Sequence, residues 1–298
     1  MLYTGELAAL GTAVCWASAS NLFAGAAGRM GSRILNRLRI TAAWGFLSVT
    51  LWLVHHALWP TWASAPATLA LALSGMIGFI FGDSFGFRAI VILGPGRASL
   101  LASTAPLFTT ALAWPLLHQH PGPMALLGMV LTLSGTAFVF TAPSRRRHGH
   151  AEGGIAMGIA SGLLGALGQA GGYVLSKIAL RTGLDPLSGT VIRVGCACVT
   201  IWILTGMARQ VVPTLAALRD ARSTLFTLGG ALLGPCLGVL LSLTALQLIE
   251  AGVAASITAV SPLFAMLIAA KFHNERLTRR ALVGSVFAVA GIVVLFRR

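Results

Sequence analysis

The sequence predicts an all-α membrane protein: ten transmembrane helices arranged as two inverted repeats of five. The first observation behind this is composition, because 56% of the 298 residues are hydrophobic and only 9% are charged, whereas soluble proteins carry about 25% charged residues. The second is an internal repeat. Residues 101–140 align without a gap on residues 257–296, a shift of 156 residues that places Pro106 on Pro262.

Apolar runs close to the ~20-residue length of a transmembrane helix recur along the whole chain. Membrane β-strands are excluded because the runs are too long and lack alternation. Five spans per half is an odd number, so two fused copies would enter the membrane from opposite sides. This arrangement is typical of secondary transporters with a midplane site. The spans are predicted at about 5–26, 34–58, 67–92, 95–117, 122–141, 153–177, 186–207, 223–248, 251–271 and 278–296.

The polar stretch that begins at Ser144 divides the chain. We expect a first repeat over residues 1–144, a linker over 145–152 and a second repeat over 153–298. The net charge of +14 does not predict nucleic-acid binding, because the basic residues are split among many short connections instead of forming one patch. The four cysteines have no metal-site spacing. We therefore expect a lipid bilayer as a partner, and no nucleic acid, metal or cofactor.

Two rows of glycines recur at every fourth residue in the third and eighth spans. Small residues at this spacing let membrane helices approach closely. Because the repeat relates the two rows, we expect the third and eighth spans to pack near the pseudo-two-fold axis. The rows are Gly78, Gly82 and Gly86, and Gly230, Gly234 and Gly238.

Asp83 is the acidic residue that lies well inside a predicted span. A carboxylate at that depth costs several kcal/mol unless it is paired, hydrated or protonated, and it marks a functional site by default. The repeat places Val239 at the equivalent position, so the fold itself does not require the charge. The alternative is a structural aspartate bonded to Ser84 or to distorted backbone near the glycines. The functional reading predicts that Asp83 faces a cavity between the halves.

Further polar and aromatic residues occupy the spans that would line such a cavity. Arg39 and Arg193 could each snorkel to the interface, pair with Asp83 or hold a substrate carboxylate; snorkelling is the preferred interpretation of Arg193. Pro106 and Pro262 predict kinks that could act as hinges. The other candidates for the cavity are Trp16, Ser20, Asn21, Gln169 and Tyr173.

One motif occurs once in each half. The first copy reads Ala89, Gly94, Ala98-Ser99, Pro106-Leu107-Phe108, Gly128 and Gly135, and the second reads Ala245, Glu250, Ala254-Ala255, Pro262-Leu263-Phe264, Gly284 and Gly291. This doubled motif resembles the EamA-type branch of the drug/metabolite transporter superfamily. The family often opens its second helix with an arginine, as at Arg39 and Arg193, and often carries a glutamate after the fourth helix of each half. Glu275 matches that glutamate, whereas the first copy has Gln119, and Gly82-Asp83 resembles a variant pair of the family.

The resemblance implies ten helices, with the first four of each half around a central cavity and the fifth and tenth outside. It also implies a secondary transporter, not an enzyme, that exports amino acids or similar small metabolites by alternating access. No Walker A motif is present to use ATP directly. Protons could act as the coupling ion through Asp83, and simple facilitated exchange is the alternative. Efflux of lipophilic cations is the alternative within transport; an intramembrane enzyme or scaffold is the alternative outside it.

The expected location is a bacterial inner membrane, as a multi-pass monomer or homodimer. Sidedness is ambiguous. Most lysines and arginines flank the span ends on the side of the central linker, so the positive-inside rule places the linker in the cytoplasm and both termini outside. The family resemblance suggests the reverse.

Overall fold

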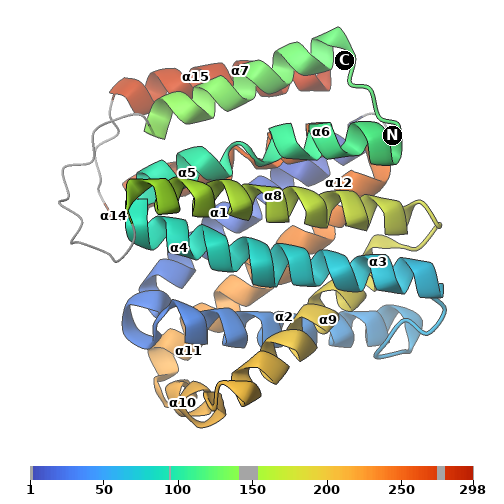
Figure 1. Ribbon diagram of the computed structural model, residues 1–298, viewed down its shortest axis with the longest axis vertical. Helices are drawn as coiled ribbons and strands as arrows, with labels where there is room; N and C mark the ends of the chain where they lie inside the picture. Colours follow the sequence, from blue (N-terminus) through green and yellow to red (C-terminus); the bar gives the residue numbers. More distant parts are fainter. Residues whose placement is uncertain (1–2, 94, 141–153, 274–278, 298) are drawn as a thin grey trace.

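The structure is a computed structural model that describes residues 3–93, 95–140, 154–273 and 279–297 (Figure 1). These residues form helices and connections without a strand, so the all-helical prediction is confirmed for them. The first half contains α1 (Thr4–Met30), α2 (Ser32–His55), α3 (Ala65–Gly75), η1 (Met76–Gly82), α4 (Asp83–Leu93), α5 (Pro95–Ala102), α6 (Ala105–Leu117) and α7 (Pro123–Phe140). The second contains α8 (Ile155–Leu180), α9 (Pro186–Met207), α10 (Val211–Ala216), η2 (Ala217–Arg219), α11 (Ala221–Ala231), η3 (Leu232–Gly238), α12 (Val239–Leu248), α13 (Ala251–Thr258), α14 (Ser261–His273) and α15 (Arg279–Phe296).

Within the described ranges, 8 helical stretches are long and apolar enough to cross a membrane. Two shorter apolar helices, α7 and α15, fall where the fifth and tenth spans were expected, and the count of ten spans stays a prediction. The 8 stretches are Thr4–Met30, Ser32–His55, Ala65–Leu93, Arg97–Leu117, Ile155–Leu180, Pro186–Met207, Ala221–Leu248 and Ala251–Ile268.

The repeat found in the sequence recurs in the boundaries of the helices. Adding 156 residues to the bounds of α3, η1, α5, α6 and α7 gives those of α11, η3, α13, α14 and α15. Both η1 and η3 are π-helical turns, which are frequent at functional sites. In both halves the helix also stops and restarts one residue before a proline, Pro106 in α6 and Pro262 in α14. The predicted kinks are therefore interruptions between two helices, and hinging at them stays a prediction.

The two copies run in opposite directions. In Figure 1 the chain passes from α3 at the right to α4 at the left, but from α11 at the left to α12 at the right. Helices α7 and α15 lie side by side at one end of the molecule (Figure 1). Glycines permit this contact, because a Cβ on Gly135 would lie 2.4 Å from the Ala288 nitrogen, and one on Gly291 would lie 2.4 Å from the Thr132 nitrogen.

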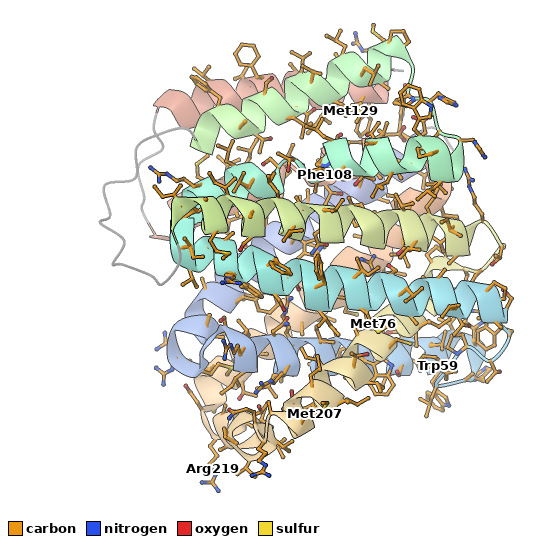
Figure 2. The ribbon with its side chains drawn as sticks, in the orientation of Figure 1. Trp59, Met76, Phe108, Met129, Met207 and Arg219 are labelled. Atoms are coloured by element: carbon orange, nitrogen blue, oxygen red, sulfur yellow. The ribbon has the colours of Figure 1, made fainter. Side chains whose placement is uncertain are left out.

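The outer surface is largely apolar. Exposed leucine, valine, isoleucine and phenylalanine side chains project from most of the long helices (Figure 2), as a lipid-facing surface requires. The buried core includes Leu47, Leu71 and Leu243, together with many alanines. Met129 of α7, labelled in Figure 2, is also buried. Its methyl carbon packs against Gly252 of α13, where an added Cβ would lie 3.4 Å away.

Candidate functional site

The first-half glycine row brings α4 and η1 against α8. A Cβ on Gly168 would lie 2.8 Å from the Cα of Gly82, and one on Gly165 would lie 3.0 Å from the Gly86 nitrogen. This contact between backbones holds the third span of one half against the sixth span, which opens the other half.

The second-half row makes the corresponding contact with the first span. Added Cβ atoms on Gly230 would meet Phe23 of α1, and on Gly234 and Gly238 they would meet Trp16. Both glycine rows therefore lie at close contacts between helices, and each row meets the first helix of the opposite half. That the third and eighth spans lie near a pseudo-two-fold axis stays a prediction. Spacing along one helix identifies a contact face, not the helix that will occupy it.

Asp83 lies directly after the π-helical turn and joins three helices through its carboxylate. One oxygen, Oδ2, accepts a hydrogen bond from Nη2 of Arg39 in α2. The other, Oδ1, accepts from Nε2 of Gln169 in α8 at 3.0 Å. Gln169 also donates to the Gly78 carbonyl at 3.2 Å. The side chain of Asp83 keeps 18% of its surface exposed, and that of Arg39 keeps 7%.

Ser84, the alternative partner proposed for Asp83, forms no hydrogen bond with it in the part of the chain that the structure describes. The carboxylate is held by Arg39 and Gln169, which are far from Asp83 in the sequence. Because Asp83 and Arg39 belong to the first half and Gln169 to the second, the carboxylate ties the two halves together.

Arg39 is held by more than its ion pair. Its Nε donates to Oδ1 of Asn36 at 2.8 Å, and its guanidinium lies 5.9 Å from the Trp16 ring centre and 5.4 Å from that of Phe23. Trp16 and Phe23 are seven residues apart on α1, so they share one helix face. Asn36 and Phe23 were not predicted from the sequence as part of the site. Their positions could have indicated it, because Asn36 lies three residues before Arg39 and Phe23 lies seven residues after Trp16, spacings that place residues on one helix face.

Two candidates on α1 stand apart from this cluster. Ser20, exposed and one turn after Trp16, donates to the Ala17 carbonyl of its own helix at 2.8 Å. Asn21 donates to the Ala17 carbonyl at 2.9 Å and to the Ala265 carbonyl of α14 at 3.3 Å. Asn21 thus ties α1 to α14, which is a packing role.

Arg193 is buried, with 2% of its surface exposed, so the snorkelling interpretation is wrong. Its guanidinium lies 5.0 Å from the Phe79 ring centre and 6.0 Å from that of Tyr173. A Cβ on Gly78 would lie 3.1 Å from Nη2 of Arg193 and 4.0 Å from Oε1 of Gln169. Gln169 therefore lies between the Asp83 carboxylate and the Arg193 guanidinium.

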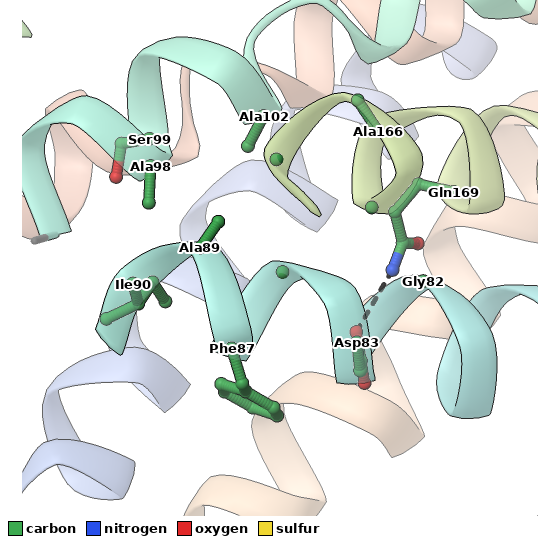
Figure 3. A pocket seen from close by; sticks show the side chains of 13 residues that line it. Gly82, Asp83, Phe87, Ala89, Ile90, Ala98, Ser99, Ala102, Ala166 and Gln169 are labelled. Carbon is green, nitrogen blue, oxygen red and sulfur yellow. Dashed lines mark hydrogen bonds between the residues drawn. The ribbon is translucent and has the colours of Figure 1, made fainter. Parts of the chain in front are cut away.

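A cavity of about 220 Å³ opens beside this cluster, between α4, α5 and α8. Figure 3 shows Gln169 reaching from α8 to Asp83 at one end of the cavity, with Ala98 and Ser99 of α5 at the other. Most of the remaining lining is glycine, alanine and the apolar side chains of Phe87 and Ile90. The site can thus present one carboxylate and one amide to a small molecule with an apolar body. Glu275 and the linker lie outside the described residues.

Comparison with known proteins gives a consistent picture. No match was found among curated proteins. One solved structure, described only as "Crystal structure of protein", superposes with a TM-score of 0.75 at 15% sequence identity, covering 99% of this chain and 96% of the other; it shows that the fold is shared. The model of the EamA-like transporter family matches residues 3–141 and again residues 156–297. The chain, a multi-pass membrane protein built from two copies of that unit, therefore belongs to the EamA-like transporter family.

Proposed function

We propose that this protein exports amino acids or similar small metabolites by alternating access around the Asp83 site. The observation that carries the proposal is the ion pair between Arg39 and Asp83, buried well inside the spans and bonded across the two halves by Gln169. An ion pair inside a membrane protein is costly and marks substrate or ion pathways. Here it also borders a cavity large enough for a small polar molecule.

The geometry supports a mechanism in which the occupancy of Asp83 controls the contact between the halves. A substrate ammonium or a proton that reaches the exposed part of the carboxylate competes with Arg39 and Gln169. Weakening those two bonds releases α2 from α4 and α8 from α4, which are contacts between moving parts in a rocking mechanism. The interruptions before Pro106 and Pro262 then serve as hinges, and protons as the coupling ion. We place the protein in a bacterial inner membrane.

A second candidate is efflux of lipophilic cations, because the cavity combines one carboxylate with a mainly apolar lining. Uptake of amino acids and of cationic dyes into proteoliposomes distinguishes the two transport functions. An amino-acid exporter moves the amino acids, and a cation exporter moves the dyes. An intramembrane scaffold moves neither, and an enzyme forms product even without an intact vesicle.

The direct test is Asp83→Asn. Asparagine keeps the shape of the side chain and one oxygen, which can accept the hydrogen bond of either Arg39 or Gln169, but it removes the charge and the proton site. We expect the variant to insert and elute as the wild type does, and to lose roughly tenfold or more of its transport rate, about 1.4 kcal/mol of barrier.

The matched control is Asp185→Asn at the N-terminal cap of α9, where the carboxylate accepts from the Ser188 nitrogen at 2.9 Å and asparagine caps equally well. Wild-type flux from a well-folded Asp83→Asn protein between pH 5 and 8 would make Asp83 structural and place the site elsewhere.

A further inference from the structure

Arg193 is a buried cation whose guanidinium makes no hydrogen bond and no ion pair with any described residue. It follows Pro186, the first residue of α9, by seven positions, about 10 Å of helix. Only 2% of its surface is exposed, and its Nε is a buried donor without a partner. Buried charges in proteins are normally paired, so this one is an exception that needs a physical account.

The surroundings of Arg193 are shaped to hold a planar cation. Phe79 of η1 and Tyr173 of α8 lie within cation–π distance of its guanidinium. Gly78 and Gly172 leave room beside Nη2, because a Cβ on either would approach it to 3.1 and 3.2 Å. The aromatic faces fix the plane of the guanidinium, but they do not neutralise its charge or satisfy its N–H groups.

The described polar groups near Arg193 form no hydrogen bond with its guanidinium, and several of them are bonded to other groups. Ser74 of α3 bonds to the Gly172 carbonyl and to Ser176. The Gln169 amide donates to Asp83 and to the Gly78 carbonyl. Asp83 itself is paired with Arg39 and reaches Arg193 only through longer-range electrostatic attraction.

The repeat shows what Arg193 lacks. Arg39 and Arg193 are the eighth residues of α2 and α9, the second helix of each half, and both lie over aromatic rings. Arg39 is neutralised by Asp83, whereas the residue that the repeat places at the equivalent position of the second half is Val239. Arginine stays protonated at any physiological pH. The cluster of Arg39, Asp83 and Arg193 therefore carries one positive charge in excess, within spans where an uncompensated ion costs several kcal/mol.

We infer that the guanidinium of Arg193 binds a carboxylate group of the transported molecule. This rests on the proposed transport function of the adjacent site. One excess charge calls for a monoanionic group, and a carboxylate matches the guanidinium fork with two parallel hydrogen bonds. An amino acid would then span Gln169, with its carboxylate on Arg193 and its ammonium toward Asp83. The substrate would complete in the second half the pair that Arg39 and Asp83 form in the first.

The test compares three molecules of one shape with the full-length protein in lipid nanodiscs: L-leucine, L-leucinamide and 4-methylpentanoate, with the corresponding phenylalanine series as a larger set. Leucinamide lacks the carboxylate and 4-methylpentanoate lacks the amine. In the wild type we expect the two carboxylates to bind roughly tenfold or more tightly than the amide. In Arg193→Gln we expect that preference to vanish, and in Arg193→Lys to be reduced but retained. Three results would each overturn the inference. The wild type could bind the acid and the amide equally well, it could bind no carboxylate up to millimolar concentrations, or Arg193→Gln could keep the wild-type preference.

Thermal unfolding without ligand supplies a readout that distinguishes a binding arginine from a structural one. Because its charge is uncompensated, replacing Arg193 by glutamine should raise the unfolding temperature of the ligand-free protein, and 4-methylpentanoate should then stabilise only the wild type. A lowered unfolding temperature would show that Arg193 is structural and contradict the inference.

Arg222→Gln is the matched control. Arg222 also lies over an aromatic ring, with its guanidinium 5.7 Å from the centre of the Phe226 ring, but it is exposed and lies outside the site.

Measuring transport into proteoliposomes distinguishes a failure of this inference from a failure of the proposed function. If carboxylates bind through Arg193 but none crosses proteoliposome membranes, the transport proposal fails while the binding site stands.

Discussion

At the scale of residues, the two arginines show how one fold treats the same charge in two ways. Arg39 is bonded to Asn36 and Asp83 and covered by Trp16, so its charge is neutralised and two of its three nitrogens donate hydrogen bonds. Arg193 has the aromatic cover without the counter-charge. Buried ion pairs are poor sources of stability but are strongly destabilising when one member is removed. The pair of Arg39 and Asp83 is therefore better explained by function than by stability.

A double-mutant cycle on this pair tests that explanation. We expect Arg39→Gln alone to lower the free energy of unfolding by about 3–5 kcal/mol, because it leaves Asp83 buried without its cation. Adding Asp83→Asn should recover a large part of the loss, with a coupling of about 1–3 kcal/mol. Chemical unfolding of the purified protein in mixed micelles measures both. Additive losses would mean that the two side chains do not interact energetically.

The exposed pair of Arg29 and Asp220, 2.6 Å apart, is the matched control for the cycle. The hydrogen bond from Arg29, aided by Ser223, lowers the pKa of Asp220 to about 2. A carboxylate with a lowered pKa stabilises the fold above its unfolded pKa near 4, and that contribution disappears as the pH falls toward 2. At neutral pH the control pair is therefore fully formed. Its coupling should nevertheless be small and weakened by salt, since both side chains are solvated.

At the scale of elements, the sequence could predict where the helices lie along the chain but not which helices pack against one another. The apolar runs, the 156-residue shift and the paired prolines anticipate the breaks at Pro106 and Pro262. The π-helical turns could not be predicted from hydrophobic periodicity. The extra residue shifts the phase of the helix, but the spans are apolar almost throughout, so the shift leaves no visible break in the pattern. The burial of Arg193 was missed for a related reason. Its distance from the end of the span allows snorkelling, and only the packing of α3 and η1 against α9 closes that route.

The contact between η1 and α8 predicts opposite effects for Gly168 and Gly171, two glycines of α8. A Cβ added by Gly168→Ala would lie 2.8 Å from the Gly82 Cα, which is backbone and cannot move aside. We expect a loss of about 1–3 kcal/mol from overpacking and reduced transport, because α8 carries Gln169 away from Asp83. Gly171→Ala meets only the Ile77 side chain, at an ordinary 3.4 Å, and should be neutral or slightly stabilising, since alanine favours helix by up to about 1 kcal/mol. Equal unfolding midpoints for the two variants would refute the tight contact.

At the scale of the whole molecule, the two halves share a framework but differ in chemistry. The glycine rows place Gln169 against Gly78 and Gly82 as they place Trp16 against Gly234 and Gly238. Trp16 and Gln169 are thus structural equivalents across the pseudo-two-fold axis, one apolar and one polar. Together with the exchange of Asp83 for Val239, this concentrates the polar groups on one side of the axis. A symmetric framework with an asymmetric site is what a transporter of an asymmetric molecule requires.

The same whole-molecule view bears on which way the protein sits in the membrane. Of the basic residues on the side of the termini, Lys177 donates to the carbonyls of Leu246 and Ile249 at the end of α12, and Arg181 donates to the Leu117 carbonyl at the end of α6. Arg193 is buried. These three act within the fold, which leaves Arg297 and Arg298 on that side.

The side of the central linker, by contrast, carries exposed arginines at several helix ends, among them Arg29, Arg33 and Arg97. The linker itself contains the run Arg145-Arg146-Arg147. The positive-inside rule counts such charges in short connections near span ends. We therefore expect the linker in the cytoplasm and both termini outside, against the orientation that the family resemblance suggests. Alkaline phosphatase fused after Arg298 should be active in bacterial cells, and green fluorescent protein inserted after His148 should fluoresce. A fluorescent fusion at the C-terminus would reverse the assignment and would show that the linker arginines serve another purpose than orientation.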